Sequence, residues 1–381
     1  MELISYDESL YHQVPKPFGE SGFTDHRFYD RYSYTLYSPD GNVGLLSGLA
    51  VYKNLNVMDG FAATQVDSKW QRNMRFSRPL HPIVEPLQLG PMRTEFPEPF
   101  KVTRMICEPN EYGDAFDLTF RPVFTRSENP HYGEANGRVH QDYRRFSQVG
   151  WTSGSIVVDG NEHQFDRWFG WRDHSWGVRP GVGGFEPFTG QKARGGIPSS
   201  SRAGGLGILL VYCGFATDSY SGFFFTIEDE NGKTLYVDGA FKDADGVESE
   251  VVSLEHQLTF VPDTHVFSAM KLQAKTANGE TWDLDVTAMG RGWVYRGTGY
   301  DAGWNDGKGL GYWRGHELSV ETDQYDVSHP ENVIMPDGST LRPYHREQPV
   351  KVRIRGEEGF GHSPMMVVGP NKRYGLEDYA S

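Results

Sequence analysis

The feature that most constrains the fold is a hairpin signal near the middle of the chain. Strand-forming residues fill 155–158 and 162–169, and the turn sequence Asp159-Gly160-Asn161 separates them. Asp-Gly between two strand-like runs is among the strongest short-range signals for a β-hairpin. We therefore expect the chain to reverse here and the returning strand to lead directly into residues 168–180.

Residues 168–180 concentrate chemically active side chains, with three tryptophans, two arginines, an aspartate and a histidine. If this strand stays extended, alternation places Trp171 and Asp173 on one face and Arg172 and His174 on the other. Two interpretations follow. Asp173 is either the ion-pair partner of an arginine within a tryptophan-rich core, or an acid that takes part in chemistry.

Short strand-like runs separated by tight turns recur in both halves of the chain. The 45 glycines, the 22 prolines and an aromatic content of 14% favour many short strands over helices. The second half has its own turns at Asn231-Gly232 and Asn278-Gly279. We predict an all-β fold of two similar barrels or sandwiches, over residues 1–180 and 204–381. The glycine-rich segment 181–203 is then a linker or a lid.

Charge and composition exclude several classes of protein. A formal net charge of −14 argues against binding to nucleic acid. No run approaches the ~18 apolar residues of a membrane helix, and the N-terminal residues do not form a signal peptide. We expect a cytoplasmic protein without membrane insertion. Cys107 and Cys213 lack metal-binding or CxxC spacing, so we expect two reduced thiols rather than a disulfide.

Motifs for common cofactors are missing from the sequence. It has no GxGxxG opening a helix, no GKS or GKT phosphate loop, no HExxH and no Gly-x-Ser-x-Gly elbow. Its thirteen histidines do not fall at ligand spacing. We therefore expect neither a cofactor nor a metal.

Two further clusters combine charged and aromatic residues. Residues 311–317 include Trp313 and precede an acidic run at 321–326, which is typical of a solvated hairpin edge. Residues 138–146 include Tyr143 and suggest a ladder of ion pairs across neighbouring strands. Both clusters bear on function mainly if they converge on Asp173.

A resemblance to a known family adds to these inferences. Residues 137–179, with the signature Asp173-His174-Ser175-Trp176-Gly177, and residues 37–60 resemble bacterial proteins of tandem lipocalin-like build. More distantly, the chain is similar to the carotenoid 1,2-hydratases and to the lipocalin-like Diels–Alderases. The resemblance implies two lipocalin-like β-barrel domains in tandem, with a ligand cleft in one barrel mouth or between the barrels. It also implies acid–base chemistry at Asp173 and Trp171, although the hydratases carry tyrosine at the position of Trp171.

We therefore expect a cofactor-independent hydratase, dehydratase or double-bond isomerase, that is, a hydro-lyase or isomerase. Its substrate is expected to be a hydrophobic isoprenoid, polyene or steroid-like small molecule. Asp173 is the expected general acid, His174 relays the proton or orients Asp173, and tryptophan rings shelter a carbocation. Trp171 is the third catalytic candidate. The remaining candidates are Trp168, Trp176, Tyr143 and Trp313 for substrate contact, and Arg172 and Arg179 for bracing the loop.

Two alternatives stay open. The chain is either a non-catalytic lipid- or terpenoid-binding protein with a structural Asp173, or a pericyclase-like cyclase of the Diels–Alderase type. A fully bonded Asp173 far from any cavity favours the first, and an apolar cavity without an acid at the ligand favours the second. The oligomeric state is also open, a homodimer included.

Overall fold

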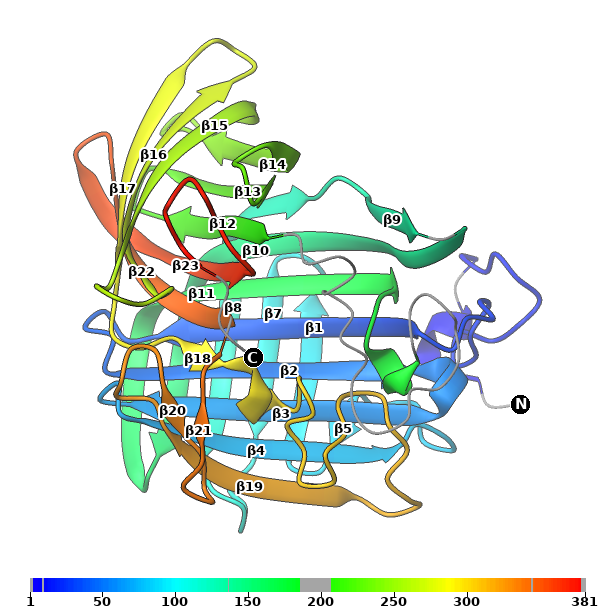
Figure 1. Cartoon of the computed structure of the whole chain (residues 1–381). Helices are drawn as coiled ribbons and strands as arrows, with labels where there is room; N and C mark the ends of the chain where they lie inside the picture. The colour runs from blue at the N-terminus through cyan, green and yellow to red at the C-terminus, as the bar shows by residue number, and fades with distance from the viewer. Residues whose placement is uncertain (1–2, 9, 136, 186–206, 344, 378–381) are drawn as a thin grey trace.

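The computed structural model describes residues 3–8, 10–135, 137–185, 207–343 and 345–377, and almost all of its regular structure is β-strand (Figure 1). Two antiparallel sheets of fourteen and nine strands hold these strands. Helical structure within the described residues is limited to short 3-10 segments, namely η1 (Ser5–Glu8), η2 (Lys53–Leu55), η3 (Val182–Gly184) and η4 (Tyr295–Thr298).

The larger sheet takes most of its strands from the first half of the chain. Its order is β21-β20-β19-β4-β3-β2-β1-β11-β10-β8-β7-β6-β5, and β9 pairs with β10 beside this path. Its strands are β1 (Phe28–Tyr37), β2 (Val43–Tyr52), β3 (Val57–Val66), β4 (Trp70–Pro79), β5 (Gln88–Leu89), β6 (Met92–Glu98), β7 (Val102–Cys107), β8 (Ala115–Ser127), β9 (His131–Ala135), β10 (Arg138–Val158), β11 (Asn161–Val178), β19 (Ser319–Asp326), β20 (Val333–Ile334) and β21 (Thr340–Leu341).

This larger sheet rolls around its own core. In Figure 1, β7 and β8 cross behind β1 and β2, and β5 comes into contact with β3 and β4. Leu45 and Phe76 from one part of the roll pack in the same buried cluster as Leu118 and Ile156 from the other. Such enclosure of apolar side chains by a curved sheet is the physical basis of a barrel.

The smaller sheet closes into a barrel of eight strands. Strand β17 pairs with β16 on one side and with β22 on the other, which closes the path through β12 and β23. Its interior is filled by large side chains such as Phe215, Phe241 and Trp282. The strands are β12 (Ile208–Ala216), β13 (Ser221–Asp229), β14 (Thr234–Lys242), β15 (Glu248–Phe260), β16 (Phe267–Thr276), β17 (Thr281–Ala288), β22 (His345–Ile354) and β23 (Glu357–Val368), with β18 (Trp293–Val294) added beside β22.

The central hairpin forms where the sequence predicts it. Strands β10 and β11 are antiparallel partners that turn at Asp159 and Gly160. Both turn residues have positive φ, 51° and 76°, which a tight hairpin turn of the right twist requires and which Asp-Gly tolerates. Strand β11 then lies between β1 and β10, so the signature residues sit in the middle of the larger sheet.

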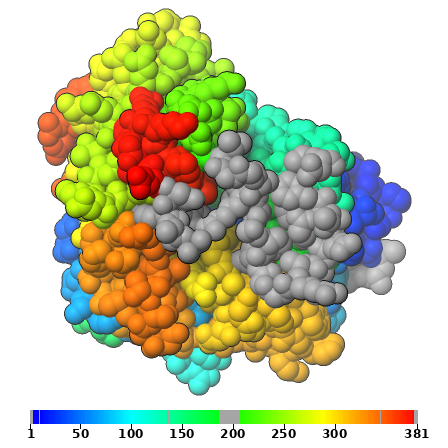
Figure 2. Space-filling view, viewed as in Figure 1, coloured from blue at the N-terminus to red at the C-terminus, as the bar shows by residue number. Residues whose placement is uncertain are grey.

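The expected fold class is confirmed, since the chain is all-β with two lipocalin-like β units in tandem. Sheet membership does not follow the two halves of the sequence, however, because β19 pairs with β4. On the face drawn in Figure 2, the orange atoms of this returning segment lie below the red and yellow-green atoms of the closed barrel. The predicted linker or lid at 181–203 lies outside the described residues from 186 onward, so the domain boundaries stay a prediction.

Two smaller expectations concern the cysteines and the membrane. Cys107 and Cys213 are both buried and unpaired, as expected. Among the described residues, no helix has the length and apolar character needed to cross a membrane.

Candidate active site

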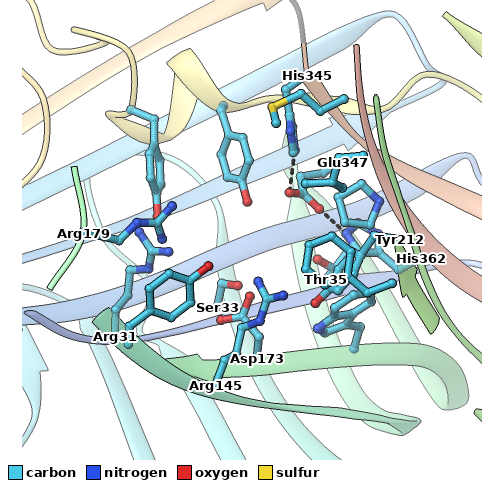
Figure 3. Close-up of a pocket in the computed structure, with 18 of the residues that line it drawn as sticks. Arg31, Ser33, Thr35, Arg145, Asp173, Arg179, Tyr212, His345, Glu347 and His362 are labelled. Atoms are coloured by element: carbon cyan, nitrogen blue, oxygen red, sulfur yellow. Dashed lines mark hydrogen bonds and ion pairs between the residues drawn. The ribbon is translucent and has the colours of Figure 1, made fainter. Parts of the chain in front are cut away.

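A cavity of about 230 Å³ lies where the two sheets meet (Figure 3). Strands β1, β10 and β11 of the rolled sheet form one wall, and β12, β13, β22 and β23 of the closed barrel form the other. Tyr295 and Tyr300, from η4 and the segment after it, complete the lining. Ligand sites commonly occupy such concave junctions between structural units.

Asp173 is an unpaired acid in this cavity. It lies opposite Ser33 of β1 and Ser147 of β10, and its Oδ1 is buried without a hydrogen-bond partner among the described residues. Burial raises the pKa of Asp173 above its usual range, although Arg145 and Arg31 act against that increase. A buried carboxyl group resists ionisation because its charged form loses the solvation of water.

Arg145 does not neutralise Asp173 because Glu128 already holds the arginine. The guanidinium donates to both carboxylate oxygens of Glu128, with contacts of 2.6 and 2.8 Å. His131 and Ser147 also contact that carboxylate, at 3.0 and 2.8 Å. Arg145 and His131 outweigh burial and lower the pKa of Glu128 to about 2. The pair is therefore a buried, satisfied ion pair beside Asp173.

The opposite wall carries a carboxylate between two histidines. Glu347 of β22 contacts Nε2 of His345 at 2.9 Å and Nε2 of His362, from β23. The two histidines lower the pKa of Glu347, despite its burial, so the carboxylate is ionised. An ionised carboxylate only accepts hydrogen bonds, so each Nε2 carries a proton and Nδ1 is the ring nitrogen that remains to exchange one.

Aromatic rings fill the space between the two walls. Trp171 is 3% exposed, and its ring lies 4.7 Å from that of Tyr212 and 4.8 Å from the His362 imidazole. Phe225 and Tyr295 also line the cavity. The site therefore combines an acid, a carboxylate–histidine group and ring faces that can cover an apolar or cationic ligand.

The cavity brings together four of the residues singled out in the sequence, namely Trp171, Asp173, Tyr143 and Arg179. Successive side chains of β11 point to opposite faces of the sheet, so the neighbours of Asp173 in the sequence lie on the face away from it. Arg172 turns into the rolled sheet, where it donates to Gln148 at 3.0 Å. His174 lies on that same face and contacts Asp30 at 2.7 Å, so it does not touch the cavity.

The other three tryptophan candidates also lie away from the cavity. Trp168 stacks on Phe165 at the core of the rolled sheet, with ring centres 3.8 Å apart. Trp176 shares the face of His174 and is 39% exposed. Trp313 is 42% exposed and packs against His316. None of these three tryptophans lines the cavity, so none can contact a substrate bound there.

Both additional clusters form ion pairs that were only partly expected. Within 138–146, Arg145 pairs with Glu128 on the neighbouring chain segment, and this pair is buried. In the acidic run, Asp323 pairs at 2.6 Å with Arg75 of β4, which is completely buried. That contact is a correction, since a solvated acidic edge was expected there. Over the described part of the chain, no His, Cys, Asp and Glu side chains group in a way that could hold a metal ion.

Sequence reasoning missed most of the wall contributed by the closed barrel. His345 and Glu347 are two residues apart on one strand, so alternation alone could have placed them on a common face. No local signal points to His362 or Glu128, because pairing between neighbouring strands brings His362 to Glu347 and Glu128 to Arg145.

The comparisons with known proteins identify a family without an assigned activity. The chain belongs to a family of unknown function, DUF8625, whose model matches residues 3–377. No curated protein matches it.

Among solved structures, the protein assigned as AttH from Nitrosomonas europaea aligns with a TM-score of 0.52 at 12% identity, covering 93% of this chain and 98% of that one. Kievitone hydratase from Nectria haematococca gives 0.39 at 11% identity, covering 93% of each chain. CghA with Sch210972 gives 0.44 at 10% identity, covering 89% of this chain and 88% of that one. At such identities the first match shows the fold alone, and the other two are too distant to carry an argument.

Proposed function

We propose that the protein is a cofactor-independent hydro-lyase or double-bond isomerase that acts on a small unsaturated molecule held between its two sheets. The observation that carries this proposal is the position of Asp173. Its buried Oδ1 has no partner among the described residues, and the side chain lines the cavity opposite the Glu347–histidine group. A carboxyl group that serves only as an ion-pair partner normally has its lone pairs satisfied.

The two walls supply complementary proton-transfer groups. In a dehydration, protonated Asp173 donates its proton to the leaving hydroxyl, the C–O bond breaks and water departs. Nδ1 of His345, which is paired with Glu347, removes a proton from the adjacent carbon, and that C–H electron pair forms the new double bond. Hydration is the reverse reaction, and isomerisation uses the same acid and base at two carbons of one substrate. Exchange with solvent returns both groups to their starting states.

The cavity favours a compact substrate. Its volume of about 230 Å³ is below the ~300–1,000 Å³ of typical ligand sites. A short isoprenoid or a small aromatic alkene fits this size better than a long polyene. The rings of Trp171 and Tyr212 lie where they can stabilise positive charge on carbon, worth up to ~2 kcal/mol for each desolvated contact. The resemblance of the Asp173 signature to the carotenoid hydratases supports the same class of reaction.

A second candidate is a non-catalytic protein that binds a small lipid or terpenoid. The aromatic lining favours it, because Trp171, Tyr212 and Phe225 can hold an apolar ligand without any proton transfer. A cyclase that folds its substrate without an acid is a third interpretation of the same lining.

Isotope labelling separates these candidates even while the substrate is unidentified. The protein is incubated in D2O with a metabolite extract, and masses that change are recorded for the wild type and for Asp173→Asn. With the products read after transfer to H2O, we expect a loss of 18 Da (dehydration), a gain of 19 Da (hydration with one carbon-bound deuterium), or carbon-bound deuterium without other change (isomerisation), only with the wild type. An unlabelled isomeric product would indicate a pericyclic cyclase. Ligand retention without any conversion would indicate a binding protein.

A further inference from the structure

Two arginines in the cavity have no counter-ion among the described residues. Arg31 of β1 and Arg179, just after β11, both line it, and Figure 3 shows them together at the end away from Glu347. Neither guanidinium donates a hydrogen bond to, or forms an ion pair with, any described residue. Nε of Arg31 is buried and unsatisfied. Leaving two like charges unpaired in a partly buried site is costly unless something else binds them.

Aromatic rings hold these two guanidinium groups near one another. Both guanidinium carbons lie 5.6 Å from the centre of the Tyr29 ring. Tyr300 covers Arg31 at 4.9 Å, and Tyr143 lies 5.8 Å from Arg179. These contacts fix the position of the side chains but leave their N–H donors available, because a ring face accepts no conventional hydrogen bond.

The third arginine of the cavity, by contrast, has an ion-pair partner within the protein. Arg145 is held by Glu128 through short, two-pronged contacts. Asp173 also lines the cavity, but it forms no ion pair with Arg31 or Arg179, and burial raises the pKa of its carboxyl group. The donors of Arg31 and Arg179 therefore remain for a ligand.

We propose that Arg31 and Arg179 bind the carboxylate of the substrate, so that the proposed hydro-lyase or isomerase acts on a compact unsaturated carboxylic acid. The inference rests on the function proposed above for the choice of reaction, and on the two unpaired arginines for the anion. Guanidinium groups match the geometry of a carboxylate through paired N–H donors. A dianionic phosphate fits less well, because the ionised Glu347 stands at the other end of the same small cavity.

A bound carboxylate also assists the acid. A second negative charge near Asp173 disfavours ionisation of its carboxyl group, so the acid holds its proton more firmly once the substrate is bound. Substrate binding would in this way increase the fraction of Asp173 that is ready to donate.

The test compares an acid with its neutral analogue. Binding of cinnamate, cinnamamide and phenyl phosphate to the full chain is measured by titration calorimetry at neutral pH. We expect cinnamate to bind one to one, at least tenfold more tightly than cinnamamide and more tightly than phenyl phosphate. Equal affinity for the acid and the amide, or no binding of cinnamate, would overturn the proposal. Preference for phenyl phosphate would overturn the choice of carboxylate.

Variants assign the preference to the two arginines. Arg31→Met and Arg179→Met should each reduce cinnamate affinity at least tenfold and leave cinnamamide affinity unchanged, with Arg353→Met on the exposed barrel surface as the matched control. Each variant should keep the melting temperature close to that of the wild type, because loss of the ring contacts is offset by removal of a charge without an ion-pair partner. A lowered melting temperature with unchanged cinnamate affinity would show that the arginines are structural. Cinnamate binding without Asp173-dependent conversion in the labelling experiment would refute the reaction and leave the anion site standing.

Discussion

Two groups of buried charged residues differ in whether the described part of the protein supplies their ion-pair partners. Where β4 meets β19, Arg75 is fully buried, donates to Asp323 at 2.6 and 3.1 Å and also donates to the carbonyl oxygen of Gly297 at 2.9 Å. In the cavity between the sheets, Asp173, Arg31 and Arg179 are left without ion-pair partners among the described residues. The first group has the contacts of a structural ion pair. The second lacks such ion pairs, which is typical of a site that completes its contacts with a ligand.

The largest expected effect is on activity. Asp173→Asn keeps the size and shape of the side chain but cannot supply a carboxylic proton. We expect turnover, once a substrate is identified by the labelling experiment, to fall roughly 10²–10⁴-fold, since general acid catalysis typically contributes that much. Steady-state kinetics on both forms measures it. Turnover within a few-fold of the wild type would remove Asp173 from the chemistry.

Substitution in the Arg75–Asp323 pair should instead lower the stability of the fold. Asp323→Asn leaves the buried Arg75 with only the longer ion-pair contact to Glu321, at 3.5 Å, and we expect the free energy of unfolding to drop by about 3 kcal/mol. Chemical denaturation followed by tryptophan fluorescence measures the loss. Turnover per folded molecule should stay near that of the wild type. A variant with normal stability would mean that the comparison between the two groups is mistaken.

The stability that Glu128 contributes to the fold should depend on pH. Its folded pKa of about 2 lies below its ordinary value, so the contribution is complete above about pH 4.5 and disappears as the pH falls toward 2. The shift corresponds to about 3 kcal/mol at neutral pH. Unfolding of the wild type and Glu128→Gln between pH 2 and 7 should therefore converge at the acid end. A constant difference across this range would contradict the assigned role.

The smallest expected effect on stability comes from an exposed ion pair. Arg353 and Glu358 are 2.9 Å apart and largely exposed, at 63% and 73%. Arg353→Met should change the free energy of unfolding by less than about 1 kcal/mol, because solvent screens such pairs. A loss as large as that of Asp323→Asn would show that burial does not govern the strength of ion pairs in this fold.

Local patterns predicted the fold and one wall of the site. The Asp159-Gly160 turn fixed the central hairpin, and alternation along 171–174 separated Asp173 from Arg172 and His174. The same alternation places Trp168 and Trp176 on the face opposite Asp173, which agrees with their positions outside the cavity. The sequence does not show which strands of the two sheets meet. That pairing brings Glu347 and His362 to the cavity and takes β19 to β4, through contacts between residues more than a hundred positions apart.

The ionisation of Asp173 in the folded protein tests the central claim most directly. The free energy of unfolding is measured from pH 4 to 8 for the wild type and Asp173→Asn. A raised folded pKa means that the native state holds its proton longer than the unfolded chain, so this contribution to stability is lost as the pH rises through the folded pKa. We predict that the two proteins are similarly stable near pH 4 and that the wild type falls behind by up to about 1.4 kcal/mol per pH unit, until Asp173 ionises. A wild type that gains on the variant as the pH rises would show a paired, ionised Asp173 and contradict the account.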